Sequence, residues 1–195
     1  MKIVVRVLLP LLLVLMVLGV VAAVRAGDSI THHARLLDQL DELGRILEQP
    51  ERRAEEVSGW STHDHVEHLL LANEGILETV AAGREPETVE PTTMLGRVVL
   101  LSGFIPRGQG QAPDSTVPED LSTAEAVALL GRVRAAAEAV DPEALPEGIV
   151  GNHPVFGGFT GPDWMRLMDV HDRHHLKIVT DIEAAADDAG GDATG

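Results

Sequence analysis

The sequence predicts an all-α protein built as a four-helix bundle, and three observations lead to that fold class. Apolar residues recur at three- and four-residue intervals through several long segments. Two of these segments open with the Ser-Thr-x-Asp/Glu pattern of a capping box. No segment shows the apolar/polar alternation that is typical of half-buried β-strands. Because each such helix has one apolar face, we expect these faces to pack against one another.

The first two helices are expected at residues 31–49 and 61–82. In the first, leucines and isoleucines follow helical spacing as far as Pro50, which cannot continue a helix. In the second, Ser61 can cap the helix while Asp64 reaches back to the backbone of the capping residue. The apolar row that follows carries this helix to the glycine at position 83.

The second half of the chain contains two further helices. A short apolar piece at residues 94–104 is followed by a loop rich in glycine and proline at 105–113. The third helix is expected at 122–140, again after a capping box, and the last at 160–186, with Pro162 in its first turn. These four helices would form the bundle.

The N-terminus predicts a membrane-directed segment. Residues 7–24 carry no polar side chain, and as a helix they would extend about 27 Å, close to the thickness of the hydrocarbon core. Lys2 and Arg6 precede this run, which places the rest of the chain outside the cytoplasm by the positive-inside rule. A cleaved signal peptide, giving a secreted protein, and a single-pass membrane anchor both fit. The length of the run favours the anchor.

Composition limits the domain count and the class of partner. The 195 residues are 45% hydrophobic, enough for one packed core. We expect an anchor or signal segment at 1–26, the bundle at 27–186 and a disordered tail at 187–195. The net charge of −16 disfavours binding to nucleic acid, and the absence of cysteine excludes disulfides and thiolate ligands. Oligomeric state is not indicated.

A pair of histidines in the last helix is the strongest chemical signal. His171 and His175 stand four residues apart, so that both imidazoles lie on one helix face and can bind the same metal ion. Bundle metal sites draw ligands from facing helices, and His68 lies at the edge of the apolar stripe of the second helix. His65 and His63 lie nearby and are expected to face solvent, although spacing alone leaves the choice among the three open.

Several of these residues also resemble a known family. The pair Trp60-Ser61 followed by His68-Leu69, together with the C-terminal pattern His171-x-x-His174-His175-Leu176, is similar to the DinB-like superfamily of four-helix-bundle proteins, also called YfiT-like metal-dependent hydrolases. The segment His-Pro-Val-Phe-Gly-Gly-Phe-Thr at residues 153–160, followed by Trp164, resembles one uncharacterised branch, whose members carry a similar segment before the last helix. The resemblance covers residues 31–186.

The resemblance implies a divalent metal bound by His68, His171 and His175. It also implies a metal-dependent hydrolase, or a transferase that joins a low-molecular-weight thiol to an electrophilic small molecule. Three neutral imidazoles suit Zn²⁺, Ni²⁺ or Fe²⁺ and leave coordination positions open. No catalytic acid or base is singled out. The alternatives are a non-catalytic metal- or ligand-binding module at the membrane and a structural bundle without metal.

Other histidines receive supporting roles. His174 lies about 100° around the helix from His175, so we expect it to support a ligand or to exchange roles with that residue. His65 has the same two alternatives, a supporting partner or a substitute ligand. His32 and His33 belong to no cluster in the sequence and are expected at the surface.

Aromatic residues before the last helix suggest either a lid or a plug. His153, Phe156 and Phe159 lie among glycines and can cover the site, although His153 can simply fix a turn and the phenylalanines can fill the end of the bundle. We favour this second interpretation. Trp60 and Trp164 are expected to be anchors in the core.

Overall fold

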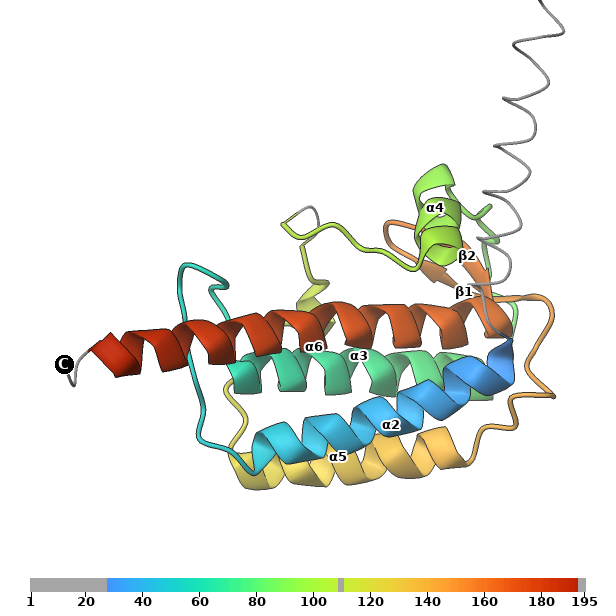
Figure 1. The fold of residues 1–195 in the computed structure, drawn as a ribbon. Helices are drawn as coiled ribbons and strands as arrows, with labels where there is room; N and C mark the ends of the chain where they lie inside the picture. Colours follow the sequence, from blue (N-terminus) through green and yellow to red (C-terminus); the bar gives the residue numbers. More distant parts are fainter. Residues whose placement is uncertain (1–27, 109–110, 193–195) are drawn as a thin grey trace, which may run out of the picture.

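The computed structural model describes residues 28–108 and 111–192 of the chain (Figure 1). In this part, four long helices pack side by side and confirm the predicted all-α bundle. They are α2 (Ser29–Leu47), α3 (Thr62–Ala82), α5 (Thr123–Glu138) and α6 (Gly161–Asp192). Both α2 and α3 contact α5 on one side and α6 on the other. The expected hydrophobic helix in residues 1–26 lies outside the described residues.

Local capping groups define where the helices begin, as the sequence predicts. At the start of α3, the Ser61 side chain accepts from the backbone N–H of Asp64, and the Asp64 carboxylate accepts from the Ser61 N–H. Ser122 and Glu125 form the same reciprocal pair at the start of α5. Gly83 ends α3 in the left-handed conformation. Each of these ends lies within three residues of the predicted one.

The last helix is longer than expected. It continues to Asp192, so residues 187–192 of the expected tail are helical, and residues 193–195 lie outside the described part. Near its end, Arg52 pairs with Asp187 across the surface. α6 therefore extends past the core, and the segment before α3 lies along this extension.

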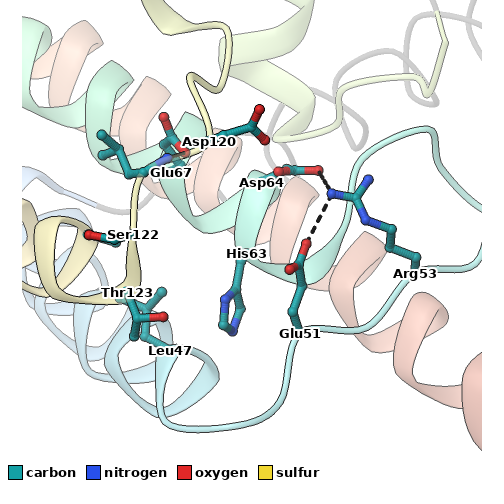
Figure 2. A pocket seen from close by; sticks show the side chains of 11 residues that line it. Leu47, Glu51, Arg53, His63, Asp64, Glu67, Asp120, Ser122 and Thr123 are labelled. Atoms are coloured by element: carbon teal, nitrogen blue, oxygen red, sulfur yellow. Dashed lines mark hydrogen bonds and ion pairs between the residues drawn. The ribbon is translucent and has the colours of Figure 1, made fainter.

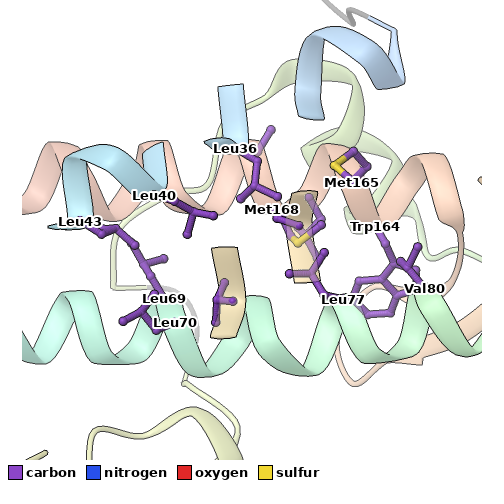
Figure 3. Packing of buried hydrophobic residues seen from close by; sticks show 14 of the residues in the cluster. Leu36, Leu40, Leu43, Leu69, Leu70, Leu77, Val80, Trp164, Met165 and Met168 are labelled. Carbon is purple, nitrogen blue, oxygen red and sulfur yellow. The ribbon is translucent and has the colours of Figure 1, made fainter. Parts of the chain in front are cut away.

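The core lies between the four helices and is made mainly of leucine and valine (Figure 3). The apolar stripes expected from the sequence face this core, because burying them removes their surface from water. Its fully buried members include Leu36, Leu40 and Leu43 of α2, Leu69 and Leu70 of α3, and Met165 and Met168 of α6.

A small hairpin at one end of the bundle was not expected from the sequence. Strands β1 (Ile149–His153) and β2 (Gly157–Thr160) pair antiparallel and lie close to the short helix α4 (Met94–Ser102) (Figure 1). The backbone N–H of Thr93 donates to the carbonyl of Phe156, and that of Gly158 donates to Glu90. Contacts with residues about sixty positions earlier thus support strands whose own sequence, rich in glycine, carries no alternating pattern.

The predicted membrane anchor requires correction. Within residues 28–108 and 111–192, no helix is long and apolar enough to cross a membrane. The structure therefore does not support a single-pass anchor with the domain on the extracytoplasmic side. Residues 7–24, on which that expectation rested, lie outside the described residues.

The two histidines at the start of α2 are not the surface residues that the sequence suggests. His32 is only 4% exposed, and its Nδ1 lies 2.7 Å from Oδ2 of the buried Asp169 on α6. His33 is partly buried, with Nε2 2.8 Å from the carbonyl oxygen of Ala137 at the end of α5. Both partners are more than one hundred residues away in the chain, so local sequence patterns could not indicate them.

We predict that Gly157→Ala destabilises the hairpin more than Gly59→Ala affects its loop. Gly157 has a φ of 76°, and a Cβ atom there would lie 2.3 Å from the carbonyl oxygen of Pro91. Gly59 has ordinary φ and nothing within 4 Å of such an atom. In urea unfolding, we expect Gly157→Ala to lower the free energy of unfolding by more than about 1 kcal/mol. Equal effects of the two substitutions would contradict this account.

Candidate metal centre

Three histidines from two helices converge on one point between α3 and α6. His68 comes from α3, while His171 and His175 come from successive turns of α6. One imidazole nitrogen from each lies within 4.8 Å of the other two. Nε2 of His68 and Nε2 of His171 lie 3.2 Å apart. The structure thus brings together the three residues singled out from the sequence.

The spacing of these nitrogens fits ligands of a single transition-metal ion. Imidazole nitrogens bind Zn²⁺ at about 2.0–2.1 Å, so two ligands at the tetrahedral angle lie roughly 3.3 Å apart. The measured 3.2 Å between His68 and His171 agrees with this value. The ring of His175 lies 4.7 Å from each of the other two rings, centroid to centroid. The three imidazoles are therefore already close enough to bind one metal ion without any movement of the helices.

Burial keeps these imidazoles uncharged. It lowers the pKa of His171 to about 3, with a further contribution from nearby His68. Burial also lowers the pKa of His175 well below its ordinary value, again assisted by its histidine neighbours. For His68, burial lowers the pKa while the hydrogen bond to a backbone carbonyl opposes the change. Neutral imidazoles have a lone pair available, so a metal ion would not need to displace protons at neutral pH.

A backbone carbonyl fixes the orientation of His68. Its Nδ1 donates to the carbonyl oxygen of Thr116 at 2.7 Å, which leaves the Nε2 lone pair directed at His171. Thr116 ends the short 3-10 helix η1 (Asp114–Thr116). The preceding residue on α3, Glu67, accepts from the backbone N–H groups of Glu119 and Leu121. Two adjacent residues of α3 therefore hold the segment that supplies the carbonyl.

Trp60 lies beside the three histidines rather than in the core. It is only partly buried, and its ring centroid lies 4.9 Å from that of His68. It stacks on His175 at 6.3 Å with an angle of 25° between the ring planes. Trp164, by contrast, is 6% exposed and is the core anchor that we expected. Trp60 therefore supplies a flat apolar wall to the site.

His65 contacts the triad, whereas His63 faces elsewhere. His65 is 2% exposed, which corrects the expectation that it faces solvent, and its Nδ1 lies 2.9 Å from Nδ1 of His175. His174 is partly buried, and its ring meets that of His175 edge-on at 5.0 Å. His63 is bonded to the carbonyl of Gln49 at 3.1 Å. Of the two residues expected to support a ligand, His65 has the direct nitrogen contact.

The aromatic residues around β1 and β2 fill the end of the bundle. Nδ1 of His153 accepts from the N–H groups of Val155 and Phe156, at 3.1 and 3.3 Å, which fixes the turn between the strands. Phe159 is fully buried and packs edge-on against Trp164. Phe156 is partly buried and stacks on His153 at 4.3 Å. Burial in the core suits a plug and leaves Phe159 unable to cover a site as a lid.

The acidic residues nearest the triad in sequence are bonded to other groups. Asp169 accepts from Gln39 and lies in contact with His32 and Arg35. Asp172 accepts from Asn73 at 2.9 Å, and burial raises its pKa to about 8. The remaining three have the following partners: Asp64 with Ser61 and Arg53, Glu67 with Glu119 and Leu121, and Glu74 with Arg132. None of these contacts involves the triad.

A separate polar pocket of about 260 Å³ lies on another face of α3 (Figure 2). Its lining includes His63, Asp64 and Glu67 of α3, together with Asp120 from the segment before α5. Arg53 enters it and pairs with Asp64 at 3.1 Å. His68 and the pocket residues therefore lie on different faces of α3, and His63 belongs to the pocket.

Comparison with known proteins agrees with this geometry. A family model described as the DinB superfamily matches residues 24–179. The chain belongs to the DinB superfamily. This confirms the resemblance drawn from the tryptophan and histidine motifs, while the branch with the His-Pro-x-Phe-Gly segment stays a prediction. A search of curated proteins and a search of solved structures gave no match for this DinB-like chain.

We predict that the metal-free protein loses stability as the pH falls below about 6.5. The folded-state pKa of His171 is about 3, and those of His65 and His153 are about 4, all below the ordinary value of about 6.5. Between these values the unfolded chain binds protons that the folded chain does not, so these histidines make the free energy of unfolding rise with pH. Asp172, whose pKa burial raises to about 8, contributes one proton in the opposite sense, so the rise is reduced and gives way to a shallow fall above about pH 6.5.

Urea unfolding with chelator present, at pH 4.5 to 7.5, measures this dependence. We expect a slope of roughly 1.4 kcal/mol per pH unit for each histidine that becomes protonated on unfolding. The double variant His171→Gln/His175→Gln should show a shallower slope. A flat profile for the unmodified protein between pH 4.5 and 6.5 would show that these histidines are not held neutral.

Proposed function

We propose that this DinB-like protein binds one divalent transition-metal ion through His68, His171 and His175 and acts as a metal-dependent hydrolase or thiol transferase on a small electrophilic substrate. One observation supports this most strongly: three neutral imidazole nitrogens from two helices lie within 4.8 Å of one another. Buried polar groups in proteins are normally paired with groups of opposite character. Three lone pairs directed at one point are best satisfied by a cation.

The donor set favours Zn²⁺, Ni²⁺ or Fe²⁺. Imidazole is a borderline ligand that suits these ions, whereas Mg²⁺ and Ca²⁺ prefer oxygen. Three protein ligands leave coordination positions for an exchangeable group, the arrangement found in catalytic rather than structural sites. An ion bound there would supply Lewis acidity and would lower the pKa of a coordinated water or thiol.

The residues of the chain position and shield this site. Thr116 holds His68 in the tautomer with a free Nε2, and the burial that lowers the pKa of the histidines limits access of bulk water. Trp60 stacks alongside with part of its ring exposed, and it offers an apolar surface against which a small substrate can lie. These features support reaction of a small molecule rather than binding of a polymer.

A non-catalytic metal- or ligand-binding module is the second candidate function. Its support comes from the acidic residues: Asp64, Glu67, Glu74, Asp169 and Asp172 are all bonded to groups outside the triad. A hydrolase that moves protons through a carboxylate would need one of them to be free to contact the substrate. A thiol transferase depends less on such a group, because a thiol bound to a metal is readily deprotonated.

We predict that the full-length protein, purified without a histidine tag, contains close to one equivalent of divalent transition metal. Mass spectrometry with plasma ionisation measures this directly. The variant His171→Ala/His175→Ala should contain little metal, and His63→Ala, on the other face of α3, should retain it. Metal at a hundredfold excess over the dissociation constant should raise the free energy of unfolding by about 2.7 kcal/mol in the unmodified protein and in His63→Ala, but not in the double variant. Absence of metal in all three, even after loading, would leave a structural bundle.

We predict that His68→Ala reduces turnover by at least about 100-fold while helical circular dichroism is retained. Loss of a ligand should exceed the 10–100-fold effect that is usual for residues supporting one. The assay uses p-nitrophenyl acetate for hydrolysis and chlorodinitrobenzene with a low-molecular-weight thiol for transfer. Turnover above background that disappears in His68→Ala supports an enzyme. Metal binding without turnover in either assay would favour the binding module.

A further inference from the structure

We propose that His65 and Ser58 form a positioning pair that fixes His175, so that its Nε2 rather than its Nδ1 binds the metal ion. This inference rests on the proposed metal site and adds the residues that orient one of its ligands. His68 receives its orientation from the carbonyl of Thr116, and His175 receives the corresponding orientation from a side chain of α3. Neither His65 nor Ser58 is itself assigned as a ligand.

A continuous set of hydrogen bonds links the segment before α3 to the triad. Nδ1 of His65 lies 2.9 Å from Nδ1 of His175, and Nε2 of His65 lies 3.0 Å from Oγ of Ser58. The backbone N–H of Trp60 also donates to Oγ of Ser58, at 3.1 Å. His65 is 2% exposed, so water offers it little alternative. Both ring nitrogens of His65 are therefore engaged within the protein.

These contacts select one arrangement of protons. A neutral imidazole carries one N–H and one lone pair, so only one of the two facing Nδ1 atoms can donate. If His175 keeps the lone pair of Nε2 for a metal, its proton is on Nδ1 and is donated to His65. His65 must then carry its own proton on Nε2, where Ser58 accepts it. In this arrangement, each donor in the series from His175 through His65 to Ser58 faces an acceptor.

The opposite arrangement is incompatible with a metal ion bound at Nε2 of His175. With the proton of His65 on Nδ1, its Nε2 would accept from the Ser58 hydroxyl, and His175 would carry its proton on Nε2, pointing into the cluster of lone pairs from His68 and His171. That state suits a bundle without metal, since the N–H could donate to a neighbouring imidazole. The two arrangements therefore correspond to a site ready for metal and a site closed to it.

The segment that carries Ser58 is fixed against α6 just before the hydrogen-bonding residues. Ala54 packs with Ile178 and Ile182 in a small apolar cluster, one and two turns beyond His175. The N–H of Ser58 donates to the carbonyl of Ala54 at 3.0 Å, which closes a turn. Because this turn is anchored to the helix that carries the ligand, it can hold His65 and His175 in constant register.

The geometry distinguishes His65 from a fourth ligand. Among the described residues, the group of nitrogens lying within 4.8 Å of one another consists of His68, His171 and His175, and His65 is outside it. Its contact is instead a hydrogen bond to one member of the group. His174 meets His175 only through ring edges, at 5.0 Å, and cannot fix its proton in this way.

Two substitutions of His65 separate positioning from packing. In His65→Asn the side-chain oxygen takes the place of Nδ1 as acceptor for His175, whereas His65→Leu fills similar space without an acceptor. His63→Asn is the matched control on the same helix, because His63 bonds to Gln49 and not to the triad. All variants are full-length, and circular dichroism checks that they are folded.

Titration with Co²⁺ against a competing chelator gives the affinity and the visible spectrum of the site. We expect His65→Leu to bind about 10–100-fold more weakly, His65→Asn to recover most of this loss, and His63→Asn to match the unmodified protein. Unchanged affinity and spectrum in His65→Leu would overturn the positioning role alone. An equal loss in both His65 variants, with a spectrum showing one nitrogen fewer, would make His65 a ligand and overturn it as well. An unmodified protein that binds no Co²⁺ would overturn the proposed function.

Nitrogen-15 NMR of the unmodified protein tests the same inference without reliance on a variant that folds. In the Zn²⁺-loaded full-length chain, long-range proton–nitrogen spectra should show His175 protonated on Nδ1 and His65 protonated on Nε2. A proton on Nε2 of His175, or on Nδ1 of His65, would overturn the proposal. If His65 serves only to fill space, neither His175 nor His65 is expected to be restricted to one tautomer.

Discussion

The buried face of α6 carries polar groups that must find partners on neighbouring helices, and much of the structure depends on this requirement. An unpaired buried polar group costs about 1–3 kcal/mol, more if it is charged. Along α6 these groups form hydrogen bonds with side chains of α2 and α3. The pairs are Asp169 with His32 and Gln39, Asp172 with Asn73, and His171 and His175 with His68 and His65. Their directional hydrogen bonds restrict how α6 can rotate or slide.

This restriction explains how a leucine-rich bundle can hold a site with atomic accuracy. Apolar packing stabilises the bundle but tolerates small shifts, since hydrophobic burial has no direction. A metal site requires its ligands within roughly 0.5 Å of their places. The contact of Asp169 with His32 fixes α6 against α2, and the hydrogen bond from Asn73 to Asp172 fixes it against α3. On α6, His171 lies between Asp169 and Asp172, and His175 lies one turn further on. The two contacts therefore hold α3 and α6 in register at the triad.

The parts of the fold and site that the sequence predicts are those encoded by local spacing. Capping boxes and apolar periodicity give the bundle helices to within a few residues, except at the end of α6, and the four-residue spacing of His171 and His175 places both on one face. The rest depends on distant partners. His32 and Asp169 are 137 residues apart, and His65 and His175 are 110 apart. The hairpin likewise depends on contacts with the segment before α4, because its strands lack an alternating pattern.

The charge around the triad bears on which substrates the site can favour. Three imidazoles bring no negative charge, and the carboxylate of Asp169 pairs with Arg35 and lies in contact with His32. Near them, Oδ1 of Asp172 and Oδ1 of Asn73 are both buried without a partner. Burial raises the pKa of Asp172 to about 8, which favours its neutral form in the folded protein at neutral pH. A divalent ion would therefore meet neutral surroundings, and an anionic exchangeable ligand such as a thiolate would balance its charge better than a neutral one.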